Sequence, residues 1–383
     1  KSRVTQVLRE RLADDTHTRL RYQCSPYYMN SAFYPVIAQL ERAAGFARDD
    51  DADAKLDKME ALLGQSATHT ALFAALLSLP IERYPALVLS PQKQKENTLA
   101  ALADQVAGLA ASQPVLMIFE DAHWIDPTTL ETIGAVIAAI RDHPVLLVIT
   151  SRPEFESPWT GHGHVTSLTL GRLGRKLGAA MVAKVIGGKA LPEEVLDHIV
   201  AKTDGVPLFV EELTKTVIES EIVREGDDAY ELTGPLTELA IPSTIQDSLM
   251  ARLDRVAETK NVAQIGSCIG RSVDSDLLSS AAGLSADALQ SALGRLVNSE
   301  ILVQLGTPPN ATYMFKHAMI HEAANVSLLR SRRRAIHRKI VQALKKDFSE
   351  RIEREPEYLA RHLTEAELFE EAAEAWLRAG NRA

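Results

Sequence analysis

Hydrophobic and polar residues along the first 150 positions follow a pattern that predicts strands separated by helices. An amphipathic helix is predicted over residues 3–14, and a short strand over 18–24 follows it. The runs 114–119 and 145–150 are apolar without alternation, which is typical of strands buried on both faces of a parallel sheet. Such a succession predicts an α/β sheet with right-handed crossovers. The helices between the strands are predicted over residues 32–44, 54–63, 70–79, 92–111 and from Pro127 onward.

After Leu170 the strand patterns mostly stop and helical patterns replace them. Two predicted helices, 275–282 and 285–298, are followed by two short strands, 301–304 and 312–315, and this order is typical of a winged helix. The turn between these strands is expected at Pro308-Pro309-Asn310. The other predicted helices are 175–185, 192–202, 207–221 and 244–257, a basic helix over 330–348, and a helical pair over 355–379.

These patterns divide the chain into four predicted segments. Residues 1–172 form an α/β core, and residues 173–257 form a helical domain. Residues 258–328 form a winged-helix-like domain. Residues 329–383 comprise the basic helix and the start of an α-helical repeat.

Composition removes several classes of function. Hydrophobic residues make up 46% and charged residues 24% of the 383 residues, which is ordinary for a globular protein. No stretch of about 18 residues is apolar and free of charge, so the sequence predicts no membrane span. The formal net charge of −9 argues against a protein whose whole surface binds nucleic acid. Cys24 and Cys268 have no partner spacing and there is no signal-like segment, so we expect a reducing, cytoplasmic environment.

A pair of carboxylates follows the first fully apolar strand. Glu120 and Asp121 come directly after it, at the end where parallel sheets bind their ligands. Adjacent carboxylates are costly at a buried strand end unless a cation or hydrogen bonds compensate them. A nucleoside triphosphatase needs acids there to hold Mg²⁺ and to position water. The alternative is that both acids cap the helix that begins at Pro127, a role that Asp126 fits better.

The next strand ends in Thr150, Ser151 and Arg152. In a doubly wound sheet its end lies beside the first, so Arg152 would face a phosphate held near Glu120. The guanidinium suits this role because it binds phosphate oxygens bidentately. The alternative is a loop arginine paired with Glu154 or Glu156.

Lys1 and Ser2 stand at the head of the first predicted helix. A phosphate-binding loop has the form G-x-x-x-x-G-K-[ST], and its last two residues open the helix whose N-terminus holds the anion. Lys1-Ser2 is too short to be a motif, but the acid pair about 120 residues later gives it weight. We therefore expect the glycines just upstream, with the α/β core truncated at its N-terminus.

Four segments resemble, in the same order, motifs of the STAND-type AAA ATPases, a class of P-loop NTPases. Residues 119–127 (Phe-Glu-Asp-Ala-His-Trp-Ile-Asp-Pro) resemble the Walker B segment, and Thr150-Ser151-Arg152 resembles the sensor motif. Residues 203–212 resemble the G-x-P motif of the helical domain, and 315–318 with 328–332 resemble the segment after the winged helix.

A narrower resemblance covers essentially the whole chain. It is similar to the ATPase region that follows a class III adenylate/guanylate cyclase domain in many bacterial proteins. Residues 359–363 and 375–380 are similar to the start of the tetratricopeptide repeats that usually end that region. This resemblance implies a regulatory switch that binds ATP or ADP with Mg²⁺ and hydrolyses ATP slowly.

The resemblance also implies roles for single residues. Lys1 would contact the β- and γ-phosphates, and Ser2 would bind Mg²⁺. Glu120 would act on the metal through water, and Asp121 would position the attacking water. The other implied nucleotide contacts are Thr150, Arg152 at the γ-phosphate, Gly205, Pro207 against the adenine, and His317 as either a sensor or a core histidine.

Three functions remain open. The first is an ATP-dependent switch, tethered to a cyclase domain outside the chain and contacting protein partners through its helical repeat. The second is a DNA-binding transcription regulator of the same ATPase class, and the third is a signalling scaffold whose nucleotide site has decayed. A basic cluster would serve the second function, or would be a solvated helix face or a partner of the acidic segment 365–374: Arg330, Arg332, Arg333, Arg334, Arg338 and Lys339.

Overall fold

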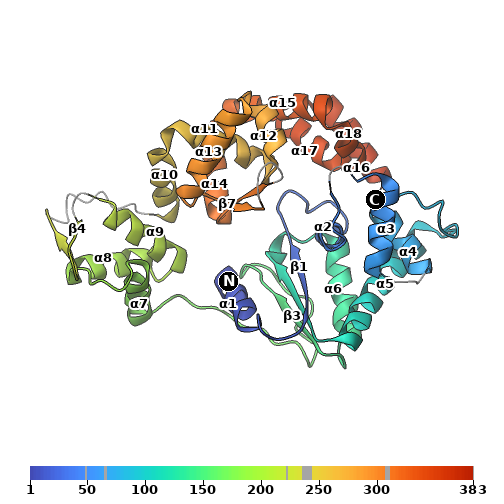
Figure 1. The fold of residues 1–383 in the computed structure, drawn as a ribbon, viewed down its shortest axis with the longest axis horizontal. Coiled ribbons are helices and arrows are strands. Elements are labelled where there is room, and N and C mark those ends of the chain that lie inside the picture. The colour runs from blue at the N-terminus through green and yellow to red at the C-terminus, as the bar shows by residue number, and fades with distance from the viewer. Residues whose placement is uncertain (48–49, 64–66, 221–222, 235–243, 307–310, 383) are drawn as a thin grey trace. The chain divides into compact units, whose positions relative to one another are not determined.

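The computed structural model describes residues 1–47, 50–63, 67–220, 223–234, 244–306 and 311–382 (Figure 1). The chain forms two compact units, which are described separately below. Unit 1 comprises Lys1–Leu168 with Leu377–Ala383, and unit 2 comprises Thr169–Trp376. Within the described ranges, every helix is too short or too polar to span a lipid bilayer.

A parallel sheet organises unit 1. Its strands β1 (Thr18–Gln23), β2 (Val115–Glu120) and β3 (Val145–Ile149) lie in the order β1-β2-β3. The sequence predicted the three strands and the neighbouring ends of β2 and β3, but not the place of β1. Gln23 is in register with Glu120, and Phe119 is in register with Ile149. The register brings the carboxyl ends of all three strands to the same edge of the sheet, where ligands of parallel sheets bind.

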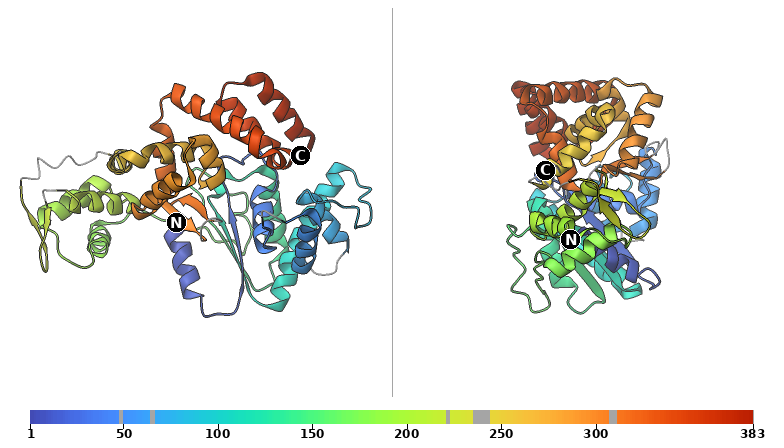
Figure 2. Two further views of the ribbon diagram at one scale, coloured as in Figure 1. Left: turned by 45° about the horizontal axis from the view of Figure 1, so that its top comes forward. Right: turned by 90° about the vertical axis from the view of Figure 1, so that its left-hand side faces the viewer.

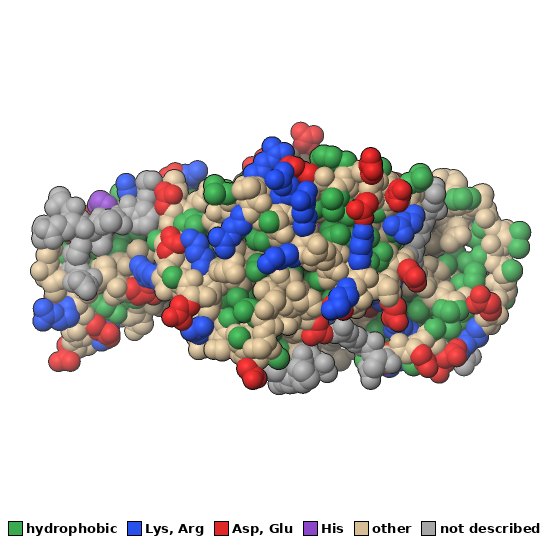
Figure 3. Space-filling model, turned by 90° about the horizontal axis from the view of Figure 1, so that it is seen from above, with side chains coloured by type: hydrophobic (Ala, Val, Ile, Leu, Met, Phe, Trp, Pro, Cys, Tyr) green, Lys and Arg blue, Asp and Glu red, His purple; other side chains and the backbone are tan. Residues whose placement is uncertain are grey.

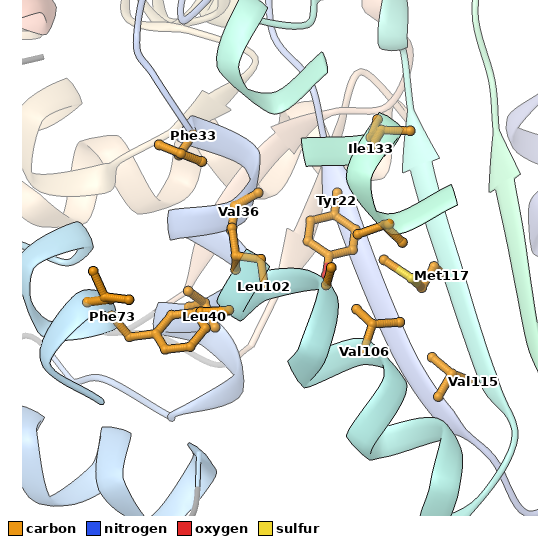
Figure 4. Close-up of a cluster of buried hydrophobic side chains, with 14 of the residues drawn as sticks. Tyr22, Phe33, Val36, Leu40, Phe73, Leu102, Val106, Val115, Met117 and Ile133 are labelled. Carbon is orange, nitrogen blue, oxygen red and sulfur yellow. The ribbon is translucent and has the colours of Figure 1, made fainter. Parts of the chain in front are cut away.

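The core of unit 1 lies between this sheet and its helices. Helices α2 (Tyr34–Ala43), α5 (Pro91–Ser112) and α6 (Pro127–Ala139) contact the sheet or one another. The Tyr22 and Phe119 rings stack with centroids 4.1 Å apart, and aliphatic side chains from β2, α2 and α5 surround them (Figure 4). Each such side chain contributes about 1.5–3 kcal/mol when fully buried. Three further helices complete this unit: α1 (Ser2–Arg11), α3 (Ala52–Leu63) and α4 (Ala67–Leu76).

The two apolar strands differ in burial. All six residues of β2 are buried, as the sequence predicted. The prediction for residues 145–150 was wrong in part, because β3 is only partly buried and Leu146 is 50% exposed. The physical reason is position, since β2 lies between two strands while β3 pairs with β2 alone among the described residues.

The first half of unit 2 is mainly helical. Its helices α7 (Arg175–Val185), α8 (Glu193–Thr203) and α9 (Pro207–Ile218) enclose buried aliphatic side chains such as Ile199 and Leu213. A short antiparallel hairpin of β4 (Val223–Glu225) and β5 (Tyr230–Leu232) follows, and the sequence analysis missed it. Helix α10 (Ile245–Arg255) closes this half.

A second group of helices and a small sheet follow in unit 2. Helices α11 (Ala257–Ile269), α12 (Ser275–Ala282), α13 (Ala286–Asn298) and α14 (Ala318–Val326) accompany an antiparallel sheet. The sheet has the order β6-β8-β7, from Ser272–Val273, Thr312–Phe315 and Leu302–Leu305. The predicted pairing of residues 301–304 with 312–315 is confirmed, with Leu302 opposite Phe315. The predicted turn at Pro308-Pro309-Asn310 lies outside the described residues.

The C-terminal helices include the predicted basic helix and helical pair, and also the short α16, which was not predicted. They are α15 (Arg330–Asp347), α16 (Ser349–Arg354), α17 (Pro356–Glu365) and α18 (Phe369–Arg382). Helices α15 and α17 lie side by side in every view (Figures 1 and 2).

Several cations of the basic helix have acidic partners. Arg330 and Arg334 both pair with Glu367, and Lys345 pairs with Glu371. The surface seen from above shows both basic and acidic side chains (Figure 3). Pairing with the acidic segment, one of the three readings of the basic cluster, therefore accounts for part of it.

Candidate functional site

The backbone fixes the acid pair between the ends of neighbouring strands. The amide of Cys24 donates to the Glu120 carbonyl at 3.0 Å, and the amide of Ala122 donates to the Thr150 carbonyl at 2.8 Å. Between them Asp121 has φ 59°, in the left-handed region. That conformation costs of order 1 kcal/mol and is tolerated by Asp better than by most residues. Backbone strain of this kind at a strand end favours a functional role for the turn.

The helix cap near these acids is a different residue. The Asp126 side chain accepts a hydrogen bond from the Thr129 amide at 2.9 Å, and Pro127 occupies the first helical turn. Asp126 therefore caps α6, as the sequence indicated, and neither Glu120 nor Asp121 is needed for that task.

The carboxylate of Glu120 is nearly buried and is held by two neighbours. It is 8% exposed, and the Arg21 Nε donates to its Oε2 at 2.5 Å. The hydroxyl of Thr5, on α1, donates to its Oε1 at 3.4 Å. Sequence reasoning missed Arg21 and Thr5 because only the register of β1 against β2 and the docking of α1 place them at Glu120.

Asp121 is contacted by Gln23 and Thr150. The Gln23 side-chain amide donates to its Oδ2 at 2.9 Å, and the Thr150 hydroxyl accepts from its backbone amide at 3.2 Å. Gln23 comes from the end of β1, and the sequence analysis missed it too. Thr150, which was predicted to contact nucleotide, here stabilises the backbone turn at Asp121.

The N-terminus of α1 reaches the same sheet edge. The Lys1 ammonium donates to the carbonyl of Ser151, directly after β3. Ser2 is the first residue of the helix and its side chain is exposed. A helix N-terminus presents backbone N–H groups and a partial positive charge, both of which favour a bound anion. Lys1 and Ser2 thus belong to the same cluster as the acid pair.

Arg152 lies at this edge without a carboxylate partner in the described part of the chain. Its guanidinium carbon is 5.3 Å from the centroid of the Trp124 ring, a cation–π contact. The predicted alternative, in which Arg152 pairs with Glu154 or Glu156, therefore does not describe this structure. The exposed guanidinium keeps its donors available for a phosphate.

His123 contributes a neutral ring beside these charges. Burial lowers the pKa of His123, and Asp121 opposes this effect. Both ring nitrogens are buried and have no hydrogen-bond partner among the described residues. The centroid of the His123 ring lies 4.2 Å from that of the Trp124 ring. His123 therefore packs the turn that contains Asp121 against the same ring that Arg152 contacts.

The donor set at this edge suits a magnesium–phosphate group better than a bare metal ion. In the described ranges, no three His, Cys, Asp or Glu side chains converge as a metal site. Mg²⁺ is commonly held by one or two carboxylates together with substrate phosphates and water. Glu120, Asp121 and Ser2 could complete such a shell, while Lys1 and the N-terminus of α1 favour the phosphates.

Three predicted contacts belong to unit 2, and their roles toward a nucleotide remain predictions. Gly205 has φ 65°, and a Cβ there would lie 2.1 Å from the Leu173 carbonyl oxygen, so only glycine fits. Pro207 begins α9. His317 precedes α14, and burial lowers its pKa to about 4, so the ring is neutral near pH 7.

Comparisons with known proteins bear mainly on the N-terminal part of the chain. Residues 1–149 match the family described as AAA ATPase domain. The chain is 27% identical over 407 residues to "Uncharacterized protein R02095" of Rhizobium meliloti (strain 1021). That match covers 99% of the chain and 37% of the relative, so the chain spans just over a third of the relative's length. An AAA ATPase domain therefore occupies the N-terminal part of the chain, as the resemblance implied.

Proposed function

We propose that this chain is an ATP-binding, slowly hydrolysing regulatory switch, with its nucleotide site at the carboxyl ends of β2 and β3. One observation carries the proposal: Lys1, the acid pair Glu120-Asp121 and Arg152, which has no acidic partner in the described ranges, meet at one sheet edge. Cations for phosphate oxygens and acids for metal and water are the parts that phosphoryl transfer needs.

The surroundings of the two acids favour different roles. Glu120 is ion-paired with Arg21, so much of its charge is compensated, and it suits an outer contact to Mg²⁺ through water. Asp121 accepts a hydrogen bond from the Gln23 side-chain amide and follows the strand end directly, a place that suits the positioning of a water. Bound Mg²⁺ would neutralise charge that develops on the transferred phosphoryl group.

The cations complete the proposed site. Lys1 would bind the β- and γ-phosphates with the N-terminus of α1, and Ser2 would bind the metal. Arg152 would contact the γ-phosphate and so distinguish ATP from ADP. Pro207 against the adenine and His317 as a sensor belong to the same proposal and rest on the resemblance alone.

The finer parts of the switch are also proposals. Helices α12 and α13 with the β7–β8 hairpin have the element order of a winged helix, and α17 with α18 has that of a first helical repeat. Among the described residues, β3 pairs with β2 alone, so its other edge could accept another strand. Coupling to an upstream cyclase domain rests on the resemblance, and the greater length of the relative leaves room for it.

Two other functions are less well supported. A DNA-binding regulator would use the basic helix, but Glu367 and Glu371 already pair with three of its cations. A scaffold with a decayed nucleotide site would not need an unpaired Arg152 beside a buried, strained acid pair.

Nucleotide binding tests the proposal. Labelled ATP and ADP would be titrated with Mg²⁺ into the full-length protein. We expect micromolar binding that Lys1→Ala abolishes, and hydrolysis that Glu120→Gln or Asp121→Asn reduces by at least about tenfold. Lys176→Ala, an exposed lysine of unit 2, is the matched control. A folded protein that binds neither nucleotide would contradict the proposal and leave the scaffold.

A further inference from the structure

A second cluster of charges lies within unit 2, on the helix that begins at Pro207. Helix α9 carries two adjacent acids, Glu211 and Glu212, followed by Lys215 one turn later. The side chain of Glu212 is only 2% exposed. A buried carboxylate is strongly unfavourable unless a cation and hydrogen bonds compensate its charge.

Arg252 of α10 compensates that charge. Its Nη1 donates to both carboxylate oxygens of Glu212, at 2.7 and 2.5 Å. Its Nη2 donates to the Ser299 carbonyl at 2.6 Å and to Glu300 at 3.2 Å. One guanidinium therefore ties α9 to the turn between α13 and β7.

Glu300 also forms ion pairs with two lysines. It lies in that turn with φ 54°, and its carboxylate is 2.5 Å from the Lys215 Nζ and 3.1 Å from the Lys316 Nζ. Lys215 also pairs with Glu211 at 2.8 Å. Lys316 follows β8 directly, so the strand pair β7–β8 holds two members of the network.

The network contains equal numbers of acids and cations, and its side chains differ in their exposure to water. Three acids (Glu211, Glu212, Glu300) face three cations (Lys215, Arg252, Lys316). Glu212 is buried, whereas the Glu300 side chain is 46% exposed and reaches water. Helix α10, on which Leu249 and Leu253 are buried, also packs against α9. Paired charges of this kind specify one arrangement more than they add stability.

We propose that these six residues, called the α9 latch, hold α9 in one orientation against the α13–β7 turn and can be released at Glu300. Glu212–Arg252 is the fixed part of the latch, because releasing it would leave a buried charge. Glu300 is the releasable part, because water can replace its partners. The α9 latch sets where the segment containing α12, α13 and the β7–β8 hairpin lies relative to α9.

A link to nucleotide follows, and it rests on the proposed function. Pro207 and Glu211 are four residues apart on one helix, or about 6 Å along its axis. A shift of Pro207 between the ATP and ADP states would therefore move the α9 latch as part of a rigid helix. Such a shift biases two arrangements, which is what a ligand-driven switch requires.

Hydrogen exchange of backbone amides in the full chain tests the α9 latch without nucleotide. Glu300→Gln keeps the size of the side chain and removes its charge. We expect amide exchange to rise about tenfold for residues 299–302 and in α9. Lys316→Met removes a different member of the network and should act in the same direction. Glu225→Gln is the matched control, because Glu225 pairs with Lys189 in the same unit but outside the latch.

Two results would overturn the inference. In one, without nucleotide, the amides of residues 299–302 and α9 exchange at the same rate in Glu300→Gln and Lys316→Met as they do in Glu225→Gln. In the other, ATP and ADP bind but leave the same exchange pattern at residues 299–302. A protein that binds no nucleotide, yet shows the expected rise in Glu300→Gln, would refute the proposed function and retain the α9 latch.

Discussion

Each unit of the chain contains a nearly buried glutamate paired with an arginine, and the two pairs have different surroundings. In unit 1, Glu120 pairs with Arg21, whose side chain is 36% exposed, and the neighbouring Arg152 has no acidic partner among the described residues. In unit 2, Glu212 pairs with Arg252, which is 16% exposed and bonded on every side. The first arrangement keeps binding capacity for a charged ligand, whereas the second is satisfied by the protein itself.

Burial alone would therefore not have identified the candidate site. Glu212 is the more buried of the two acids, yet its network is neutral and complete. Glu120 is distinguished by its place at a strand end and by Asp121, whose backbone is in the left-handed region. Substitutions that break each ion pair in turn test this difference between the two pairs.

The largest effect is expected from Arg252→Met. This change leaves the Glu212 carboxylate buried without its cation, which costs about 3–5 kcal/mol of folding free energy. Urea unfolding followed by circular dichroism would measure it. Arg255→Ala is the control on the same helix, because Arg255 and Glu219 form an exposed pair whose loss should cost less than about 1 kcal/mol. Equal costs for the two variants would contradict the picture of a closed, buried pair.

A smaller, pH-dependent effect is expected at His317, beside the α9 latch. Its folded pKa of about 4 lies below the ordinary value of 6.5 because of burial. The neutral ring is favoured in the folded state, so its contribution is fully present above pH 6.5 and is lost as pH falls toward 4. We expect a loss on the order of 2 kcal/mol across this window.

His317→Leu should make stability less dependent on pH in that window, as judged from urea midpoints at several pH values. His321 and His337, whose pKa values burial also lowers, titrate over an overlapping range. The slope should therefore decrease rather than vanish. An unchanged slope in His317→Leu would contradict the claim that burial lowers the pKa of His317 in the folded protein.

Much of the α/β core could be predicted from the sequence, because continuous apolar runs identified β2 and β3 directly. The burial of β3 could not, since the same run fits a central or an edge strand. Helix α11 was missed, and it is buried all round from Val262 to Ile269, so its second half has no solvent-exposed face. The two-residue strand β6 is too short for any periodicity.

The candidate site was predicted in part. Lys1, Glu120, Asp121 and Arg152 were found because they stand at the ends of recognisable elements. Their partners Arg21, Gln23 and Thr5 were not, because only the tertiary register brings them to the acids. The same limit applies to the α9 latch, whose six members come from four separate segments.

Arg21→Met should have a smaller effect on stability than Arg252→Met. Water can reach the place of the partly exposed guanidinium, so the expected cost is about 1 kcal/mol in urea unfolding. Arg19→Met, an exposed arginine on the same strand, is the control. If Arg21→Met cost as much as Arg252→Met, the two pairs would not differ in the way described here.

The most direct test compares the affinities for ATP and for ADP in Arg152→Ala and Arg141→Ala, in the full-length protein. Arg141 is exposed in the turn before β3, at the opposite end of that strand. We predict that Arg152→Ala weakens ATP binding about tenfold or more while ADP binding changes little, because a charged hydrogen-bond donor to the γ-phosphate is lost. Arg141→Ala should bind both nucleotides like the wild type. Identical ATP and ADP affinities in all three proteins would contradict a nucleotide site at the carboxyl ends of β2 and β3.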